Sequence, residues 1–212
     1  MYDLHTHTTL SDGELLPTEL IRRMSVLGYE TVGITDHADL SNISSIIRAI
    51  EQIRSSAELY GIRLLTGVEL THLPPSQINQ MAKRAREEGA DIVIVHGETP
   101  VEPVAPGTNL AACTSEYVNV LAHPGLITTR EAEAAAELGI CLEITARGGH
   151  NRTNGHVIRV AQATGCTLVI DSDAHSPCDL MTANARELVA RGAGLSVDET
   201  ESVLSIKTNR FY

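Results

Sequence analysis

Short runs of branched aliphatic residues alternate along the chain with longer stretches whose apolar positions follow helical spacing. The short runs predict seven β-strands, at residues 2–6, 31–35, 63–69, 91–96, 118–123, 140–145 and 167–172. The longer stretches predict helices at residues 17–28, 43–60, 76–88, 130–138, 153–164, 179–191 and 197–206. Because strands and helices alternate, the order predicts a parallel β-sheet covered by helices.

Residues with known capping preferences mark the helix ends. Glycine readily adopts the left-handed conformation that ends a helix, and it follows the predicted helices at Gly28, Gly89, Gly139, Gly165 and Gly192. Ser196 and Glu199 form a capping-box pattern that predicts the start of the last helix. Prolines interrupt residues 97–117, where we expect a loop over the functional site with room for one short helix.

Composition narrows the choice of parallel fold. The chain has no Trp and one Phe, so Leu, Ile, Val and Ala must fill its core, as they fill the interior of β/α barrels. No linker divides the 212 residues, and we predict one domain, residues 1–212. No Gly-x-Gly-x-x-Gly follows the first strand and no Gly-Lys-Ser/Thr occurs, which disfavours dinucleotide and P-loop binding.

Metal-ligand residue types stand at the end of nearly every predicted strand. His5 and His7 occupy alternate positions of the first strand, which predicts that both imidazoles point to the same face. Later strands end in further residues of this kind, namely His37, Glu69, His96, His123, Asp173 and His175. The carboxyl ends of barrel strands meet at one mouth, so the pattern predicts a multinuclear metal centre there. Ordinary hydrogen-bonded histidines are the competing interpretation for any single position.

The motifs around these residues are similar to those of a known family. They are Asp3-Leu4-His5-Thr6-His7-Thr8, Ser11-Asp12-Gly13, Thr35-Asp36-His37, Gly67-Val68-Glu69, His96-Gly97-Glu98, Ala122-His123-Pro124-Gly125 and Ser172-Asp173-Ala174-His175. In this order they resemble the PHP (polymerase and histidinol phosphatase) family, from residue 1 to about residue 180. The resemblance implies an α/β fold, a distorted (β/α)7 barrel, with a trinuclear, phosphoester-hydrolysing metal site at the C-terminal ends of its strands.

The resemblance also implies which residues bind each metal ion. One ion would be bound by His5, His7, Glu69 and Asp173. A second ion would share Glu69 and would also be bound by His96 and His123. A third would be bound by His37, His175 and Asp12, although some family members have a histidine in place of Asp12. We expect two or three divalent ions, and imidazole-rich ligation favours Zn, Mn or Fe over Mg.

The chemistry that the resemblance implies is attack on phosphorus by a metal-bound hydroxide. The residues expected to be catalytic are Glu69, Asp173 and His175. Three divalent ions outweigh the carboxylates of Asp12, Glu69 and Asp173, and the excess positive charge would attract a phosphate dianion.

Candidate substrate contacts lie beside the strand ends. Arg147 and Arg152 belong to a glycine-rich stretch after the sixth strand, and either could clamp a phosphate with two hydrogen bonds. His150 is a candidate contact in the same stretch, and Glu98 could orient His96 or touch substrate. A glycine-rich surface loop with solvated arginines is the competing interpretation.

Four further polar residues are assigned no part in metal binding or catalysis. Asp36 and Asp171 are expected to support the metal ligands or the fold. Glu143 ends the sixth strand, but alternation could place its side chain against a helix instead. His72 precedes Pro74 in a loop and is expected to have no special role.

We therefore expect hydrolysis of a small-molecule phosphomonoester, as in histidinol phosphatases. One alternative is a PHP-type phosphodiesterase acting on DNA ends, which the net charge of −11 disfavours. Another is an amidohydrolase-type C–N hydrolase, but neither Lys83 nor Lys207 ends a strand where a bridging lysine would stand. A non-catalytic PHP-like scaffold is the third, and such a protein would be expected to have lost ligands.

The cellular setting is inferred from what the sequence lacks. It has no apolar run near eighteen residues and no basic segment leading into an apolar one, so we expect a cytoplasmic protein without membrane contact. The expected partner is a small-molecule phosphate ester and not nucleic acid. No feature of the sequence specifies an oligomeric state.

Overall fold

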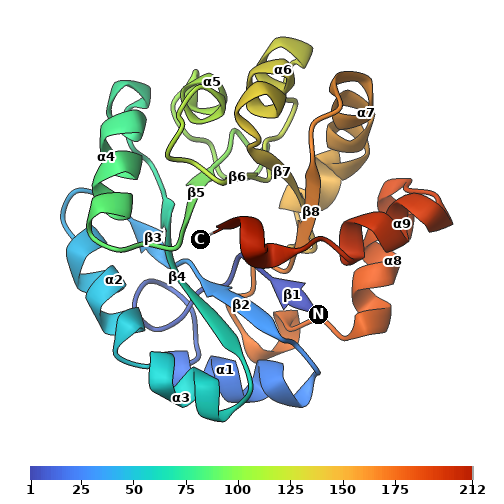
Figure 1. Ribbon diagram of the computed structural model, residues 1–212. Helices are drawn as coiled ribbons and strands as arrows, with labels where there is room; N and C mark the ends of the chain where they lie inside the picture. The colour runs from blue at the N-terminus through green and yellow to red at the C-terminus, as the bar shows by residue number, and fades with distance from the viewer. Residues whose placement is uncertain (212) are drawn as a thin grey trace.

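The computed structural model describes residues 1–211 and shows a nearly closed parallel barrel inside a ring of helices (Figure 1). Seven strands form the wall in spatial order: β1 (Tyr2–Asp3), β2 (Thr31–Ile34), β4 (Arg63–Leu70), β5 (Ile92–His96), β6 (Val120–Ala122), β7 (Cys141–Thr145) and β8 (Leu168–Asp171). A further short strand, β3 (His37–Ala38), pairs with the end of β4 beyond the last residue of β2. The predicted (β/α)7 barrel is confirmed.

Helices cover the outside of the wall, where Figure 1 shows them around the strands. They are α1 (Pro17–Val26), α2 (Ile43–Glu51), α3 (Arg54–Leu59), α4 (Pro75–Glu87), α5 (Thr108–Cys113), α6 (Thr129–Leu138), α7 (Asn154–Thr164), α8 (Ala183–Ala193) and α9 (Val197–Leu204). Short 3-10 helices span His150–Thr153, Pro177–Asp179 and Thr208–Phe211. None of the helices within residues 1–211 combines the length and the apolar character that crossing a membrane requires.

Three predicted boundaries were wrong. The helix expected at 43–60 is split into α2 and α3, and Arg54 at the start of α3 donates to the Leu64 carbonyl and to Asp91. The helix expected at 179–191 begins only after Thr182, whose hydroxyl caps it, and it passes through Gly192 to end at Gly194. The first strand is shorter than the expected 2–6.

The first strand pairs with β2 over Tyr2 and Asp3, and on its other side, toward β8, side chains take the place of ladder hydrogen bonds. The Leu4 amide donates to Asp171 at 2.7 Å, and the Ser172 amide donates to Asp3 at 3.1 Å. The two segments pair through their backbones further along, at the isolated bridge between Thr6 and Ala174. We call this region, residues 2–7 with 170–175, the seam of the barrel.

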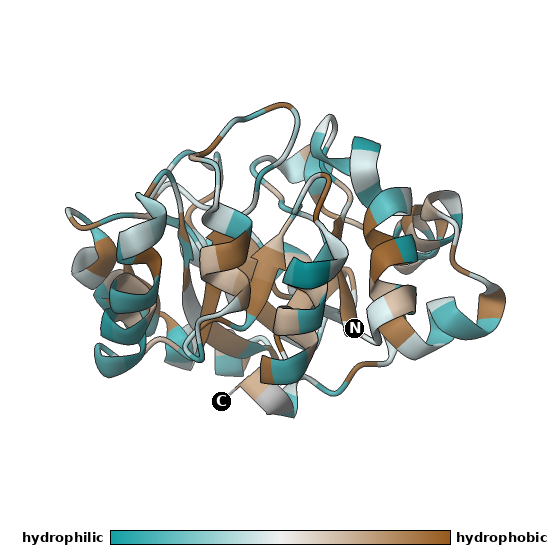
Figure 2. Ribbon diagram, turned by 90° about the horizontal axis from the view of Figure 1, so that it is seen from above, coloured by the Kyte–Doolittle hydropathy of each residue, from teal (hydrophilic) through white to brown (hydrophobic). Residues whose placement is uncertain are grey.

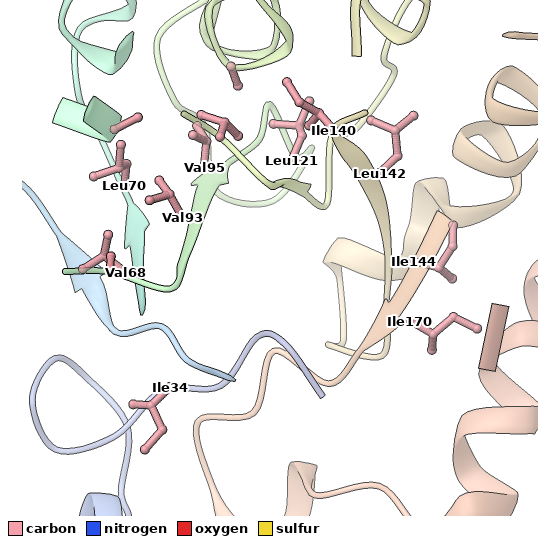
Figure 3. Close-up of a cluster of buried hydrophobic side chains, with 14 of the residues drawn as sticks. Ile34, Val68, Leu70, Val93, Val95, Leu121, Ile140, Leu142, Ile144 and Ile170 are labelled. Atoms are coloured by element: carbon pink, nitrogen blue, oxygen red, sulfur yellow. The ribbon is translucent and has the colours of Figure 1, made fainter. Parts of the chain in front are cut away.

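Alternate side chains of each strand point outward and inward, which gives two apolar layers, one between the strands and the helices and one inside the barrel. Figure 3 labels outward-facing residues such as Val68, Val93 and Leu142, which belong to the large cluster between strands and helices. Figure 2 shows the same division, with apolar strands inside and hydrophilic residues on the outer surfaces of the helices. Because Val68 and Leu70 face outward, Glu69 between them faces into the barrel.

A second apolar cluster fills the barrel interior below the polar residues. Ile92, Ile94 and Val169 belong to it, and so does Phe211 from the last 3-10 helix. The chain end lies over the barrel in Figure 1, and Phe211 is almost completely buried there. The only phenylalanine therefore packs inside the barrel, leaving the opposite mouth to the polar strand ends.

Candidate metal centre

All nine predicted metal ligands gather at the carboxyl ends of the strands, and His150 joins them. They form four overlapping groups of closely spaced ligand atoms: His7, Asp12, His37 and His175; His96, His123 and His150; His5, His123 and Asp173; and His5, His7 and Glu69. Barrel closure thus brings together residues that are up to 170 positions apart, such as His5 and His175.

Glu69 lies at the centre of the cluster, completely buried at the end of β4. Its Oε1 is 3.4 Å from His5 Nε2 and 3.5 Å from His123 Nε2, while its Oε2 is 3.6 Å from His7 Nε2. Its Oε2 also lies 2.7 Å from His37 Nδ1, an ion-pair contact, although among residues 1–211 neither oxygen has a partner with full hydrogen-bond geometry. Burial opposes the charge of Glu69, but the imidazoles of His5 and His37 outweigh it and hold its pKa well below the usual range.

Several imidazoles are oriented by a hydrogen bond from their Nδ1 atom. His5 Nδ1 donates to Glu143 at 2.6 Å, His96 Nδ1 to the Gly97 carbonyl at 3.1 Å, and His175 Nδ1 to the Asp173 carbonyl at 3.0 Å. Carboxylate and carbonyl oxygens can only accept, so these Nδ1 atoms carry the proton. Nε2 is then the nitrogen of each ring that faces the cluster and would bind a metal ion, the arrangement typical of metal-bound histidines.

Glu143 points into the barrel, which resolves its open assignment. Its second oxygen accepts the backbone N–H of His123 at 2.9 Å, so one carboxylate positions two predicted ligands. The sequence contained the evidence for this direction. Leu142 and Ile144 on either side are apolar and pack against the helices, so alternation turns Glu143 to the opposite face, inside the barrel.

Asp12 belongs to the exposed edge of the cluster. Its carboxylate lies 3.3 Å from His175 Nε2 and 3.6 Å from His37 Nε2, and its side chain is 54% exposed. Gly13 beside it has no room for a β-carbon against the His7 backbone, so the turn folds tightly onto the seam. Asp36 fixes this turn by accepting four hydrogen bonds from Thr8 and Ser11, in agreement with its expected supporting role.

His150, a candidate substrate contact, lies buried within the cluster itself. The 3-10 helix after Gly149 buries it, and its ring centroid lies 4.4 Å from that of His123. With His96 and His123 it forms a three-imidazole group. Burial, together with the neighbouring His123, lowers the pKa of His150 to about 4, so it is neutral and able to donate a lone pair.

The two candidate arginines lie in different places relative to the metal-ligand cluster. Arg147 stands at the cluster, with Nε 3.7 Å from an Asp173 oxygen and Nη1 3.4 Å from the Asp173 carbonyl. Arg152 is exposed and lines an outer groove between α7 and α8 with residues such as Leu188 and Ala193. A phosphate at the cluster is therefore accessible to Arg147 and not to Arg152.

Glu98 is engaged away from the cluster. Its Oε1 accepts the backbone N–H groups of Gly107 and Asn109, at 2.9 and 3.0 Å. In return Asn109 Oδ1 accepts the Glu98 amide at 3.0 Å. These contacts join the two ends of the loop before α5, and nothing in them points Glu98 at a substrate.

Backbone strain marks the same region. Within residues 1–211, the non-glycine residues with positive φ are His72, His123 and Asp173, at 56°, 27° and 52°. Such conformations persist where the surrounding structure enforces them, and they gather at functional sites. Two of the three are predicted ligands, and the third, His72, was expected to have no special role.

Comparison with known proteins agrees with this geometry. The family model described as PHP domain matches residues 3–162. The chain belongs to the PHP domain family. An uncharacterized protein of Methanocaldococcus jannaschii is 47% identical to it over 205 residues, covering 96% of this chain and 94% of that protein.

Other relatives match this chain over only part of their own length. The DNA polymerase/3'-5' exonuclease PolX of Bacillus subtilis is 28% identical over 194 residues, which are 82% of this chain but 34% of the polymerase. A 5'-3' exoribonuclease of Haemophilus influenzae is 40% identical over 70 residues, 33% of this chain and 23% of that protein. The chain thus spans about a third of the polymerase that it matches.

Solved structures share the PHP barrel. A histidinol phosphate phosphatase from Lactococcus lactis, complexed with Zn, L-histidinol and phosphate, superposes with a TM-score of 0.62 at 18% identity, covering 92% of this chain and 94% of the other. A two-domain protein from Bacteroides vulgatus containing a predicted PHP-like metal-dependent phosphoesterase gives 0.55 at 18% identity, covering 84% and 52%. At this identity the likeness establishes the fold.

The residues present fit the metal dependence of the PHP family. Among the described residues, the buried polar atoms without hydrogen-bond partners include both Glu69 oxygens, His96 Nε2 and His7 Nδ1. Leaving such atoms unpaired costs about 1–3 kcal/mol each, so their gathering in one place is explained if cations satisfy them. Imidazole with carboxylate is a donor set for borderline transition metals.

Proposed function

We propose that this PHP protein is a metal-dependent phosphatase that hydrolyses a small-molecule phosphomonoester. The observation that carries the proposal is the full set of nine predicted ligands, with Glu69 at their centre and one guanidinium, Arg147, beside them. Two or three Zn, Mn or Fe ions would be held there. When bound, they supply positive charge for the phosphoryl oxygens and lower the pKa of water towards neutrality.

The protein residues would contribute binding and orientation. Glu69 would bridge two ions, because its oxygens face different sets of imidazoles. Asp173 and His175, on the segment after β8, would hold the ions on the seam side and keep their positions relative to the reacting phosphorus. Arg147 would donate to a phosphoryl oxygen at the cluster edge.

The mouth of the site supports a small substrate with little negative charge beyond its phosphate. A cavity of about 290 Å3 lies there, lined by residues that include Asp12, Asp39 and Glu102. None of the Lys and Arg side chains that the structure describes lines this cavity. Polynucleotides are bound mainly by cations that neutralise successive phosphates, and outside the metal ligands this cavity offers a carboxylate, Asp39, in place of such cations.

A second candidate is a phosphodiesterase acting on nucleic-acid ends. The observation favouring it is the similarity to the exonuclease-bearing polymerase and to the exoribonuclease. The metal cluster could serve either substrate, and the net charge of −11 and the acidic mouth favour the monoester.

The test compares matched substrates on protein of known metal content. An aryl phosphate, the corresponding diaryl phosphate and an oligonucleotide would be assayed before and after chelation. We expect the monoester to be hydrolysed fastest and all activity to disappear with the chelator. Equal or faster turnover of the diester or oligonucleotide would favour the second candidate, and no hydrolysis of any phosphoester by metal-loaded protein would reject both.

A further inference from the structure

Glu102 is a carboxylate that sequence analysis did not single out, and it lies over the three-imidazole group. Its Oε2 is 3.6 Å from His96 Nε2 and 3.9 Å from His150 Nε2. Ligand atoms around one tetrahedral zinc ion, bound at 2.0–2.2 Å, are separated by about 3.4 Å. The carboxylate therefore lies near the distance at which one ion could be shared with His96 and His150.

The imidazole atom that faces Glu102 is otherwise unsatisfied. His96 is buried, and its Nε2 has no hydrogen-bond partner among residues 1–211. Its Nδ1 donates to the Gly97 carbonyl, so Nε2 is the nitrogen left to face Glu102. That pairing is favourable when a positive charge lies between the two groups, and a metal ion bound to both would supply it.

The other oxygen of Glu102 is also held. Its Oε1 lies 3.4 Å from Nε2 of His72, whose backbone has the strained φ of 56°. The His72 ring stacks on that of His96 at 5.8 Å between centroids. A polar partner for the second oxygen of a ligating carboxylate is a common feature of metal sites, because it fixes the direction of the first. His72 is placed to act as that partner at the exposed edge of the cluster.

Glu102 reaches the site from a loop that is independent of the barrel. We call residues 100–106 the proline loop, since it contains Pro100, Pro103 and Pro106. The hydrogen bonds between Glu98 and Asn109 clamp its two ends. Val101 packs on Gly149, where a β-carbon would lie 3.3 Å from the Val101 methyl groups. The loop is thus docked beside the cluster at Val101 and Glu102.

We propose that Glu102 is a further metal ligand, beyond the nine predicted ones and His150, which completes a site made of His96, His123 and His150 and couples the proline loop to metal binding. The proposal rests on the metal site of the proposed function and adds a ligand to it. It makes the ion near β5 and β6 dependent on a half-exposed loop, whereas the ions at the seam are held by strand ends.

Zinc affinity tests the ligand directly. Dissociation constants would be measured by competition with a chromophoric chelator for wild type and Glu102→Gln, with Glu58→Gln on the exposed surface as a matched loss of charge. Removing even a residue that only orients a ligand commonly weakens metal binding about 10–100-fold, and we expect at least this loss for the weakest zinc in Glu102→Gln. Glu58→Gln should match wild type. Zinc affinity in Glu102→Gln within about twofold of wild type, or higher, would overturn the proposal.

Hydrogen exchange tests the coupling to the loop. If Glu102 binds zinc, adding zinc should slow exchange of the Val101, Glu102, Val104 and Ala105 amides in wild type and leave them unchanged in Glu102→Gln. If Glu102 only pairs with imidazoles, zinc would displace it and exchange would quicken, contradicting the proposal. Neither readout uses turnover, so loss of zinc affinity in an inactive protein would uphold the ligand while rejecting the phosphatase.

Discussion

The two sides of the metal centre are built by different means. On the seam side, His5, His7 and Asp173 extend directly from strands, and buried Asp3 and Asp171 tie those strands together. On the opposite side, His96 and His123 also end strands, but His150 comes from a 3-10 helix and Glu102 from the proline loop. The seam has almost no exposed surface, whereas the Glu102 side chain is 43% exposed.

The seam side positions the metal ligands, whereas the loop side controls how a substrate reaches them. Strand ends buried on all sides have little freedom, so the seam keeps its geometry. Groups on loops can move without disturbing the barrel, and they lie where a substrate must enter. We expect changes at the seam to remove metal and activity together, and changes at the loops to alter metal affinity or substrate binding more selectively.

The largest effect is expected at the residue that both sides share. Glu69→Ala should lose two ions and reduce activity by more than about a hundredfold, because a bridge is more damaging to lose than a supporting residue. Asp12→Ala, at the exposed edge, should lose one ion at most. Elemental analysis and phosphatase assays on folded protein would measure both, and full metal content in Glu69→Ala would contradict the bridging assignment.

The second-largest effect is expected for substitution of Glu143, although this buried side chain cannot contact a substrate. Glu143→Gln retains the shape but removes the charge that His5 Nδ1 and the His123 amide face, so metal affinity should fall about 10–100-fold. Zinc titration gives the affinity, and thermal unfolding of metal-free protein serves as the control. A large loss of stability with unchanged zinc affinity would show that Glu143 supports the fold and not the ligands.

A smaller and more selective effect is expected at the arginines. Arg147→Ala should weaken phosphate binding and raise KM about tenfold, equivalent to about 1.4 kcal/mol, while keeping its metals. Arg152→Ala removes the same charge on the outer groove and should behave as wild type. Equal effects in the two variants, measured by steady-state kinetics and phosphate inhibition, would mean that the charge acts at long range.

The smallest effect on activity is expected at the clamp of the proline loop. Glu98→Ala leaves the Gly107 and Asn109 amides without their acceptor and should lower the free energy of unfolding by about 1–2 kcal/mol. For a protein of this size that is a fall in Tm of about 2–8 °C. KM should change less than twofold. Unchanged Tm with a large rise in KM would restore the substrate contact that the sequence suggested for Glu98.

The sequence determined the parts that depend on local pattern. Alternating aliphatic runs and helical spacing predicted the barrel, and the residues at the strand ends, with their resemblance to the PHP family, predicted the cluster around Glu69. These predictions succeed because strand parity fixes which side chains face inward, and parallel order fixes the end at which they meet. Even Glu143 was accessible to this reasoning through its neighbours Leu142 and Ile144.

Only the tertiary structure decided the parts that depend on loops and on contacts between distant segments. It separated Arg147 from Arg152, turned Glu98 into a clamp, and brought His72 and Glu102 to the cluster. Loop residues lack a period that states their direction, and their positions follow from where the loop ends are anchored. The seam beside the first strand has the same origin, since the side chains of Asp3 and Asp171 take hydrogen bonds that a ladder would otherwise make.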